Sequence, residues 1–168
     1  CCFLFFPKMR SFARNFNVCS LSWNPIFKPS KYLNLVRMDM KVTYLKRSVI
    51  ENLLNYARGL HPKEGILLLR GKVSKDEVFV NDTVIPPLAT HGEGFSAFPL
   101  HMLPIDFSIV GVAHSHPSGV LAPSTDDLNQ FYGKIMVIVA FPYHSERNIA
   151  VFDRDGRALT FRVVDNHL

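Results

Sequence analysis

The stretch Ile109-Val-Gly-Val-Ala-His114-Ser-His116-Pro117, followed shortly by Ser124-Thr-Asp-Asp127, decides how this chain of 168 residues is interpreted. Its first five residues form a short apolar run that is typical of a buried strand, and the run leads directly into His114. Side chains alternate between the two sides of a strand, so His114 and His116 project from the same side. Two imidazoles at one strand end can bind one metal ion.

The third metal ligand is predicted to be Asp127. Ser124 followed three residues later by an acid is typical of a helix start, and we expect a helix through about Tyr132. An acid in the first turn of that helix can point back toward the strand end. Two neutral imidazoles and one carboxylate are ligands that zinc accepts, with a fourth position left for water. Because zinc lowers the pKa of bound water to roughly 7, this open position indicates catalysis.

Two further residues complete the predicted chemistry. Glu64 precedes the apolar run Ile66 to Leu69, where partial burial would raise its pKa toward the value that a general base needs. Ser124 is placed to donate a hydrogen bond to the oxyanion of a tetrahedral intermediate. Ser115 is interpreted as orienting the loop. The remaining histidines lack partners at ligand spacing and are expected not to bind metal: His61, His91, His101, His144 and His167.

The region before this strand predicts a strand, a helix and a hairpin. Lys41 to Leu45 is the strand, and Ser48-Val-Ile-Glu51 has the S-x-x-E spacing of a helix N-terminus. The helix is expected to end near Gly59 and Pro62, with a buried face formed by Ile50, Leu53, Leu54 and Ala57. The hairpin then joins the buried strand 66–69 to the strand 78–85 through the polar turn 71–77, and residues 88–95 have loop composition.

The region after Asp127 predicts more strands. They are expected at residues 135–141, at residues 149–153 and, after a tight turn at Asp155-Gly156, through Val164. The whole chain therefore predicts an α/β fold, a mixed sheet flanked by helices.

The first 37 residues differ from the rest of the chain in charge and cysteine content. They hold six of the 19 basic residues, none of the 14 acidic residues and all three cysteines, so residues 38–168 carry 13 basic and 14 acidic side chains. The net charge of +5 belongs to this leading segment, and the domain offers no electrostatic surface for nucleic acid. We expect residues 1–37 to be an extension outside the fold, with Met38 or Met40 as the true start. An organelle transit peptide is the alternative.

The absence of cysteine from residues 38–168 favours an intracellular, cytoplasmic setting. No run of residues approaches the ~20 apolar residues that a membrane span requires. We therefore expect no membrane partner.

The residues with predicted roles together resemble a known signature. Glu64 within His61-Pro-Lys-Glu-Gly-Ile-Leu-Leu-Leu69, then His114-Ser-His-Pro117, Ser124 and Asp127, is similar to the E…H-S/T-H-P-x6-S-x2-D signature of JAMM (MPN+) metalloproteases. The similarity extends from about residue 40 to about residue 165, and the chain most resembles compact archaeal members related to the deubiquitinase of the proteasome lid.

This resemblance implies a cytidine-deaminase-like MPN domain over residues 38–168 with one catalytic zinc ion. It also implies cleavage of isopeptide bonds after the Gly-Gly tail of ubiquitin or an archaeal ubiquitin-like modifier, with the proteasome as a candidate partner. The family's first insertion would correspond to roughly residues 86–103, where a substrate tail can add as a strand. The candidate substrate-binding residues there are Gly92, Gly94, Ser96, Ala97 and Phe98.

The resemblance also has departures, and it leaves two other functions open. There is little room after Phe141 for the family's second insertion and no long C-terminal helices follow, which favours a free-standing enzyme. A protease that processes a small sulfur-carrier protein would use the same site, because those proteins also end in Gly-Gly. A non-catalytic MPN scaffold would bind partners without hydrolysis, but such scaffolds lack part of the ligand set, and here every expected position is filled.

Overall fold

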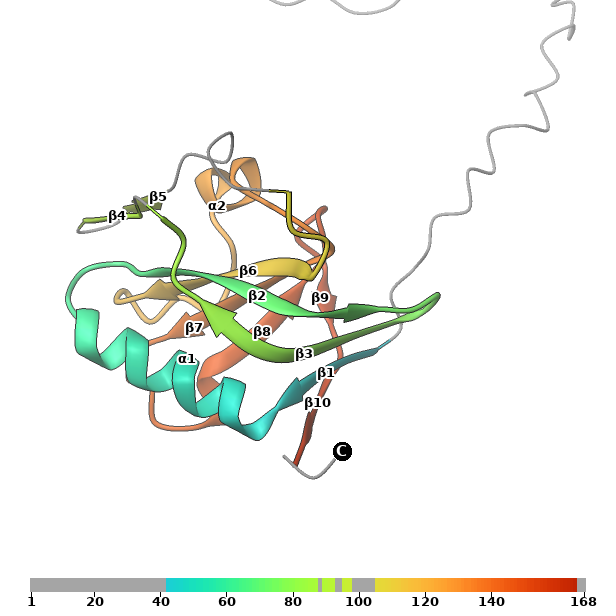
Figure 1. Cartoon of the computed structure of the whole chain (residues 1–168). Coiled ribbons are helices and arrows are strands. Elements are labelled where there is room, and N and C mark those ends of the chain that lie inside the picture. Colours follow the sequence, from blue (N-terminus) through green and yellow to red (C-terminus); the bar gives the residue numbers. More distant parts are fainter. Residues whose placement is uncertain (1–41, 88, 93–94, 98–104, 166–168) are drawn as a thin grey trace, which may run out of the picture. The chain divides into compact units, whose positions relative to one another are not determined.

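The computed structural model describes residues 42–165, apart from residue 88, residues 93–94 and residues 98–104 (Figure 1). A mixed sheet of eight strands has the order β10-β1-β3-β2-β6-β7-β8-β9. Its strands are β1 (Val42–Lys46), β2 (Ile66–Val73), β3 (Glu77–Val84), β6 (Ile109–His116), β7 (Ile135–Ala140), β8 (Ile149–Phe152), β9 (Ala158–Leu159) and β10 (Phe161–Val164). The predicted α/β fold is confirmed. No helix in the described part of the chain has the length and apolar character needed to cross a membrane.

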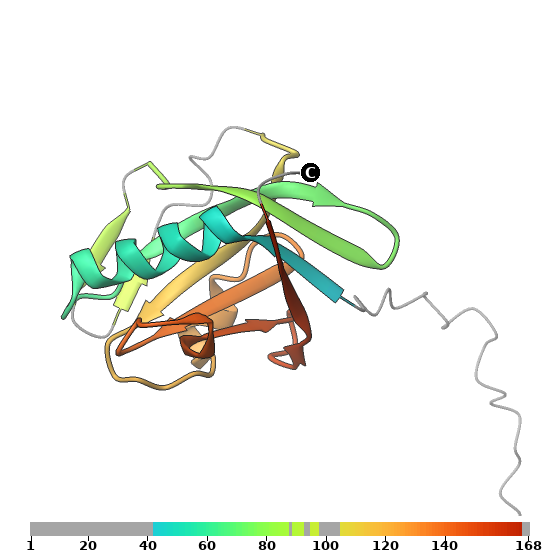
Figure 2. The same ribbon diagram turned by 90° about the horizontal axis from the view of Figure 1, so that it is seen from below.

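Two helices lie on opposite sides of this sheet (Figures 1 and 2). α1 (Arg47–Leu60) covers one face, and its buried residues include the four that its periodicity predicted: Ile50, Leu53, Leu54 and Ala57. α2 (Thr125–Asn129) lies on the other side. Each face of the sheet carries its own hydrophobic core, and the side chains of β2 alternate between the two. Leu67 and Leu69 pack in the core with α1, whereas Ile66 and Leu68 pack in the other core with Phe131, just after α2. The sheet is thus buried on both faces near its centre.

The start of α1 differs from the prediction. The helix begins at Arg47, and its N-cap residue Lys46 makes no side-chain hydrogen bond to the helix. The predicted capping pair of Ser48 and Glu51 is therefore wrong. The physical reason is that β1 runs directly into α1 without a connecting loop, so Ser48 already lies inside the first turn. Gly59 also lies within the helix, which ends one residue later.

The segment that was predicted to be a loop contains a small hairpin. β4 (Thr90–Gly92) pairs antiparallel with β5 (Phe95–Ala97) in a separate two-stranded sheet. Strands of three residues are too short to show an alternating pattern, which is why composition alone predicted a loop. The backbone N–H of Glu64 donates to the carbonyl oxygen of Gly92 at 2.8 Å. This bond attaches the hairpin to the segment that precedes β2.

The last part of the chain forms two strands where one was expected. β9 extends the β8 edge of the sheet, whereas β10 pairs in parallel with β1 at the opposite edge. The predicted turn at Asp155-Gly156 is present, with Gly156 at φ +75, a conformation that favours glycine. These two strands, only a few residues apart in the chain, therefore form the two opposite edges of the sheet.

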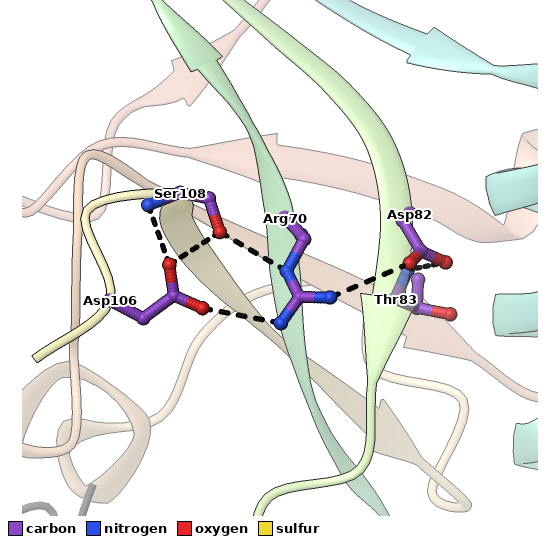
Figure 3. A network of polar contacts seen from close by, with 5 residues as sticks. All are labelled: Arg70, Asp82, Thr83, Asp106 and Ser108. Atoms are coloured by element: carbon purple, nitrogen blue, oxygen red, sulfur yellow. Dashed lines mark hydrogen bonds and ion pairs between the residues drawn. The ribbon is translucent and has the colours of Figure 1, made fainter. Parts of the chain in front are cut away.

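A polar network anchors the segment that leads into β6 (Figure 3). Arg70 on β2 donates to Ser108 at 3.1 Å and to Asp106 at 3.2 Å, and its other terminal nitrogen lies 4.0 Å from Asp82 on β3. Asp106 in turn accepts from the backbone N–H of Ser108 at 2.9 Å. The segment is therefore tied to β2 just before β6 begins, and Arg70 links it further to β3.

Candidate active site

The two histidines of β6 lie on one face of the sheet, as predicted. His114 is 1% exposed and His116 is 6% exposed. Val112, two residues before His114, points to the same side of the strand as the histidines and packs on the α2 side of the sheet. β6 continues three residues beyond the predicted strand end because Ser115 and His116 still pair with β7. Both imidazoles are thus held by a strand that is paired on both sides.

Asp127 reaches these histidines from the first turn of α2. Its Oδ1 lies 3.3 Å from His114 Nδ1, and its Oδ2 lies 3.2 Å from His116 Nε2. The predicted helix cap is present: Ser124 Oγ accepts from the Asp127 N–H at 3.1 Å, and Asp127 Oδ2 accepts from the Ser124 N–H at 2.7 Å. The cap that starts the helix therefore also orients the carboxylate. The helix ends at Asn129, earlier than the predicted end near Tyr132.

His116 is oriented by its other ring nitrogen. Its Nδ1 lies 2.9 Å from the carbonyl oxygen of Val120. Because a carbonyl oxygen only accepts, Nδ1 carries the proton in this contact. Nε2 is then directed at Asp127, and in a neutral imidazole it holds the lone pair that a metal binds.

Burial controls the ionisation of these groups. It lowers the pKa of His114 to about 4. For His116 burial is the largest single effect and acts in the same direction, but the hydrogen bonds with Asp127 and Val120 and the negative charges of Asp127 and Glu64 together outweigh it, so the pKa is raised. For Asp127 burial acts to raise the pKa, but hydrogen bonds from His116 and Ser124 outweigh it and hold the pKa well below its usual range. Asp127 is therefore an anion and His114 a neutral imidazole at neutral pH, the states that metal ligands require.

The chemistry and spacing of this donor set fit zinc. Two tetrahedral ligands at ~2.0–2.1 Å from one zinc ion lie about 3.3 Å apart, close to the distances of the two imidazole nitrogens from the Asp127 carboxylate oxygens. Each carboxylate oxygen of Asp127 faces one imidazole nitrogen directly, and the described ranges contain no group of three or more His, Cys, Asp or Glu already arranged to hold an ion. The assignment of these three residues as ligands thus stays a prediction.

Glu64 lies in the same cleft, two residues before β2. Burial raises its pKa, and the negative charge of Asp127 adds to this increase while His116 opposes it. The direction is the one expected of a group that must take up a proton near neutral pH. Its role as general base stays a prediction.

A buried contact that the sequence did not indicate fixes the position of Glu64. Ser115 Oγ accepts from the backbone N–H of Gly65 at 2.8 Å, and the Ser115 N–H donates to the Gly65 carbonyl oxygen at 2.9 Å. Ser115 points to the α1 side of β6, away from the histidines. It therefore clamps the residue next to Glu64 and does not face the cleft. Because the two residues are 50 positions apart, only the fold reveals the contact.

The cleft has a volume of about 280 Å³. Its walls include the residues with predicted roles, Glu64, His116, Ser124 and Asp127. The outer wall adds Ser118, Asp126 and Gln130. Three acidic side chains, but neither lysine nor arginine, are found among the described residues that line it. Such a cleft suits neutral or cationic groups.

The predicted substrate-binding residues fall partly within the hairpin. Gly92, Ser96 and Ala97 belong to β4 and β5. Gly94 and Phe98 lie outside the described residues. Of the histidines that were expected not to bind metal, His61 stacks on Phe141 with a centroid distance of 5.1 Å.

Comparison with known proteins gives consistent matches. Residues 46–153 match the family model described as prokaryotic homologs of the JAB domain. A relative from Haloferax volcanii, named a probable metalloprotease, is 37% identical over 116 residues, which cover 64% of this chain and 71% of the relative.

Two solved structures are also similar to this chain. One, described as "JAMM: A Metalloprotease-like Zinc Site in the Proteasome and Signalosome", has 29% identity and a TM-score of 0.51, and the match covers 75% of this chain and 98% of that chain. The other is a JAB1/MPN domain protein from Archaeoglobus fulgidus, with 28% identity and a TM-score of 0.51, and the match covers 75% of this chain and 97% of that chain.

Proposed function

This chain belongs to the family of prokaryotic homologs of the JAB domain, and we propose that it is a zinc-dependent isopeptidase. In this proposal it removes ubiquitin or ubiquitin-like proteins, such as an archaeal modifier, by hydrolysis after a C-terminal Gly-Gly. The observation that carries the proposal is that Asp127 contacts both His114 and His116, and that His116 and Asp127 line one cleft together with Glu64. The relative named a probable metalloprotease and the solved structure described as a metalloprotease-like zinc site support it.

The predicted ligand set is His114, His116 and Asp127. When bound there, zinc would polarise the scissile carbonyl and supply a water nucleophile at neutral pH. Two contacts orient members of this predicted set. Val120 fixes the imidazole of His116, and the helix cap at Ser124 fixes the carboxylate of Asp127.

Proton transfer is assigned to Glu64. Its raised pKa allows the carboxylate to take a proton from water and then to deliver it to the leaving amine. Ser124 already accepts from the Asp127 N–H with its oxygen, so its hydroxyl proton stays available for a developing oxyanion. The clamp between Ser115 and Gly65 keeps Glu64 beside the predicted ligands.

The hairpin β4–β5 is assigned to the substrate tail. Gly92 is bonded to the backbone of Glu64, so the hairpin lies next to the proposed general base. Within the described residues β5 pairs only with β4, and an unpaired edge can accept an extended peptide by backbone hydrogen bonds. A Gly-Gly tail suits this mode because it has no side chains that would meet the walls of a narrow cleft.

The proposal is tested by cleavage assays with the zinc-loaded protein. Ubiquitin-like and sulfur-carrier proteins, each joined through Gly-Gly to a reporter, are incubated with the protein, with and without a chelator. We expect cleavage of the ubiquitin-like conjugates that stops with chelator and recovers with zinc. Cleavage of only the sulfur-carrier fusions would assign the alternative substrate class. Absence of cleavage by a protein that holds zinc would point to a binding scaffold.

A further inference from the structure

Gln130 lines the same cleft as Glu64, His116 and Asp127, but the reaction described above gives it no role. It is the C-cap residue of α2, three positions after Asp127, so the two residues lie on the same side of the helix. Its backbone N–H is directed at the carbonyl oxygens of Asp126 and Asp127, both at 3.1 Å. The backbone of Gln130 is therefore held at the end of the helix that carries Asp127.

The side chain of Gln130 contrasts with this fixed backbone. Its Oε1 atom is buried and has no hydrogen-bond partner. A buried acceptor without a donor destabilises a folded protein, and native structures retain few such atoms. Because Gln130 lines the cleft while its Oε1 is buried, rotation of the terminal amide would turn the oxygen toward a ligand, and the same rotation exchanges oxygen and nitrogen within the same volume.

We propose that Gln130 binds the peptide backbone of the substrate's Gly-Gly tail, an inference that rests on the proposed isopeptidase function. Glycine has no side chain, so a protein can recognise a Gly-Gly segment only through its N–H and C=O groups and its small volume. A carboxamide offers one acceptor and two donors, the same kinds of group that a peptide bond presents. The acidic groups of the cleft are acceptors when ionised and cannot bind a substrate carbonyl, whereas the Gln130 amide can do both.

This role predicts that stability and binding respond in opposite ways to one substitution. In Gln130→Met the side chain keeps nearly the same size but loses its unpartnered oxygen, so Tm should stay unchanged or rise. The affinity for a peptide that ends in Gly-Gly should fall by about tenfold, the effect of losing one hydrogen bond or two. Asn129→Met is the matched control, because Asn129 is exposed and does not line the cleft. We expect its Kd to equal that of the wild type.

A second probe tests which group of the substrate Gln130 contacts. One glycine of the peptide is replaced by sarcosine, which removes a single backbone N–H. If Gln130 binds that N–H, the N-methyl group weakens binding to the wild type by several-fold more than binding to Gln130→Met, as a double-mutant cycle measures directly. Calorimetric titration of the zinc-loaded full chain gives all four Kd values.

The outcomes separate this inference from the proposed function. An equal effect of the N-methyl group on the wild type and on Gln130→Met, with an unchanged Kd of the variant for the unmodified peptide, would overturn the role of Gln130 even if the wild type cleaves its substrate. A lower Tm in Gln130→Met would mean that the residue acts in structure, and would also overturn it. Gln130-dependent binding without any cleavage would support the inference and reject the isopeptidase function. A wild type that binds no Gly-Gly peptide would reject both.

Discussion

The strand pair β2–β6 carries a polar network at each end, and the two networks differ in burial. At one end His114 lies opposite Ile66, and it meets Asp127 with less than a tenth of either residue exposed. At the other end Arg70 lies opposite Ile109, and its side chain is 42% exposed where it meets Asp106. Both networks join charged or ionisable groups at 3.2–3.3 Å.

The difference in burial explains why only one of these ends is suited to chemistry. Away from water, burial moves the pKa of His114 down and that of Glu64 up, which are the directions that metal binding and proton transfer require. Near water, the solvent screens the contacts of Arg70, and such surface pairs contribute little to stability. The Arg70 network is therefore interpreted as an anchor for the segment before β6.

The largest predicted effect comes from breaking the buried network at its centre. Asp127→Asn keeps the size of the side chain but removes the negative charge that faces both imidazoles, so zinc content and cleavage should both fall to background. Metal analysis after dialysis and the cleavage assay measure the two effects together. Arg70→Gln, which removes a charge at the exposed end, is the control. Full zinc binding by Asp127→Asn would contradict the predicted ligand set.

Replacement of Glu64 should separate catalysis from metal binding. Glu64→Gln preserves the shape of the residue but cannot take up a proton, so kcat should fall by ~10²–10⁴-fold while zinc content is unchanged. Single-turnover cleavage and metal analysis provide the comparison. A variant that keeps more than a tenth of wild-type kcat would exclude Glu64 as the general base. Loss of zinc together with activity would instead make it a ligand.

An intermediate effect is expected from the clamp that holds Glu64. Ser115→Ala leaves the buried N–H of Gly65 without its acceptor, so the free energy of unfolding should fall by about 1–3 kcal/mol. Urea unfolding measures this effect, with the exposed Ser74→Ala as a control. Ser115→Thr, which keeps the hydroxyl, should restore part of the loss. An unchanged unfolding midpoint in Ser115→Ala would show that the contact does not stabilise the fold.

The features that sequence predicted are those with a local signal. Alternation along β6 placed His114 and His116 on one side, and the S-x-x-D spacing placed the cap of α2, because both depend on neighbouring residues only. The S-x-x-E spacing at Ser48 gave a wrong prediction, because β1 enters α1 without a loop and the helix already begins at Arg47. The spacing of a capping pair therefore does not by itself fix the residue at which a helix begins.

The features that sequence could not predict depend on distant residues. The Ser115–Gly65 clamp joins positions 50 apart, and the Arg70–Asp106 contact joins positions 36 apart. No periodicity marks such pairs, because the sheet order β3-β2-β6 brings them together. Gln130 is an intermediate case. Its spacing of three residues from Asp127 is visible in the sequence, but only the fold shows that it lines the cleft and that its Oε1 lacks a hydrogen-bond partner.

The smallest predicted effect, at the exposed end, depends on pH. Hydrogen bonds from the side chain and the backbone N–H of Ser108 hold the pKa of Asp106 below its usual range, and Arg70 acts in the same direction. Because the folded pKa lies below the unfolded value of ~3.9, the stabilisation is present above that value and is lost as pH falls through the folded pKa. Asp106→Asn should therefore lower the urea midpoint slightly at pH 7, and the difference from wild type should shrink as pH falls toward 3.

Ser108→Ala sharpens this last prediction because it removes the side-chain hydroxyl whose hydrogen bond contributes most to the lowered pKa of Asp106. Its urea midpoint should follow the same pH dependence as Asp106→Asn, and cleavage at neutral pH should be unchanged in both variants. A difference from wild type that persisted at low pH would mean that these side chains stabilise the fold without the charge. A loss of cleavage in either variant would show that the two ends of the strand pair are coupled, because a network confined to anchoring the segment before β6 cannot alter proton transfer at Glu64.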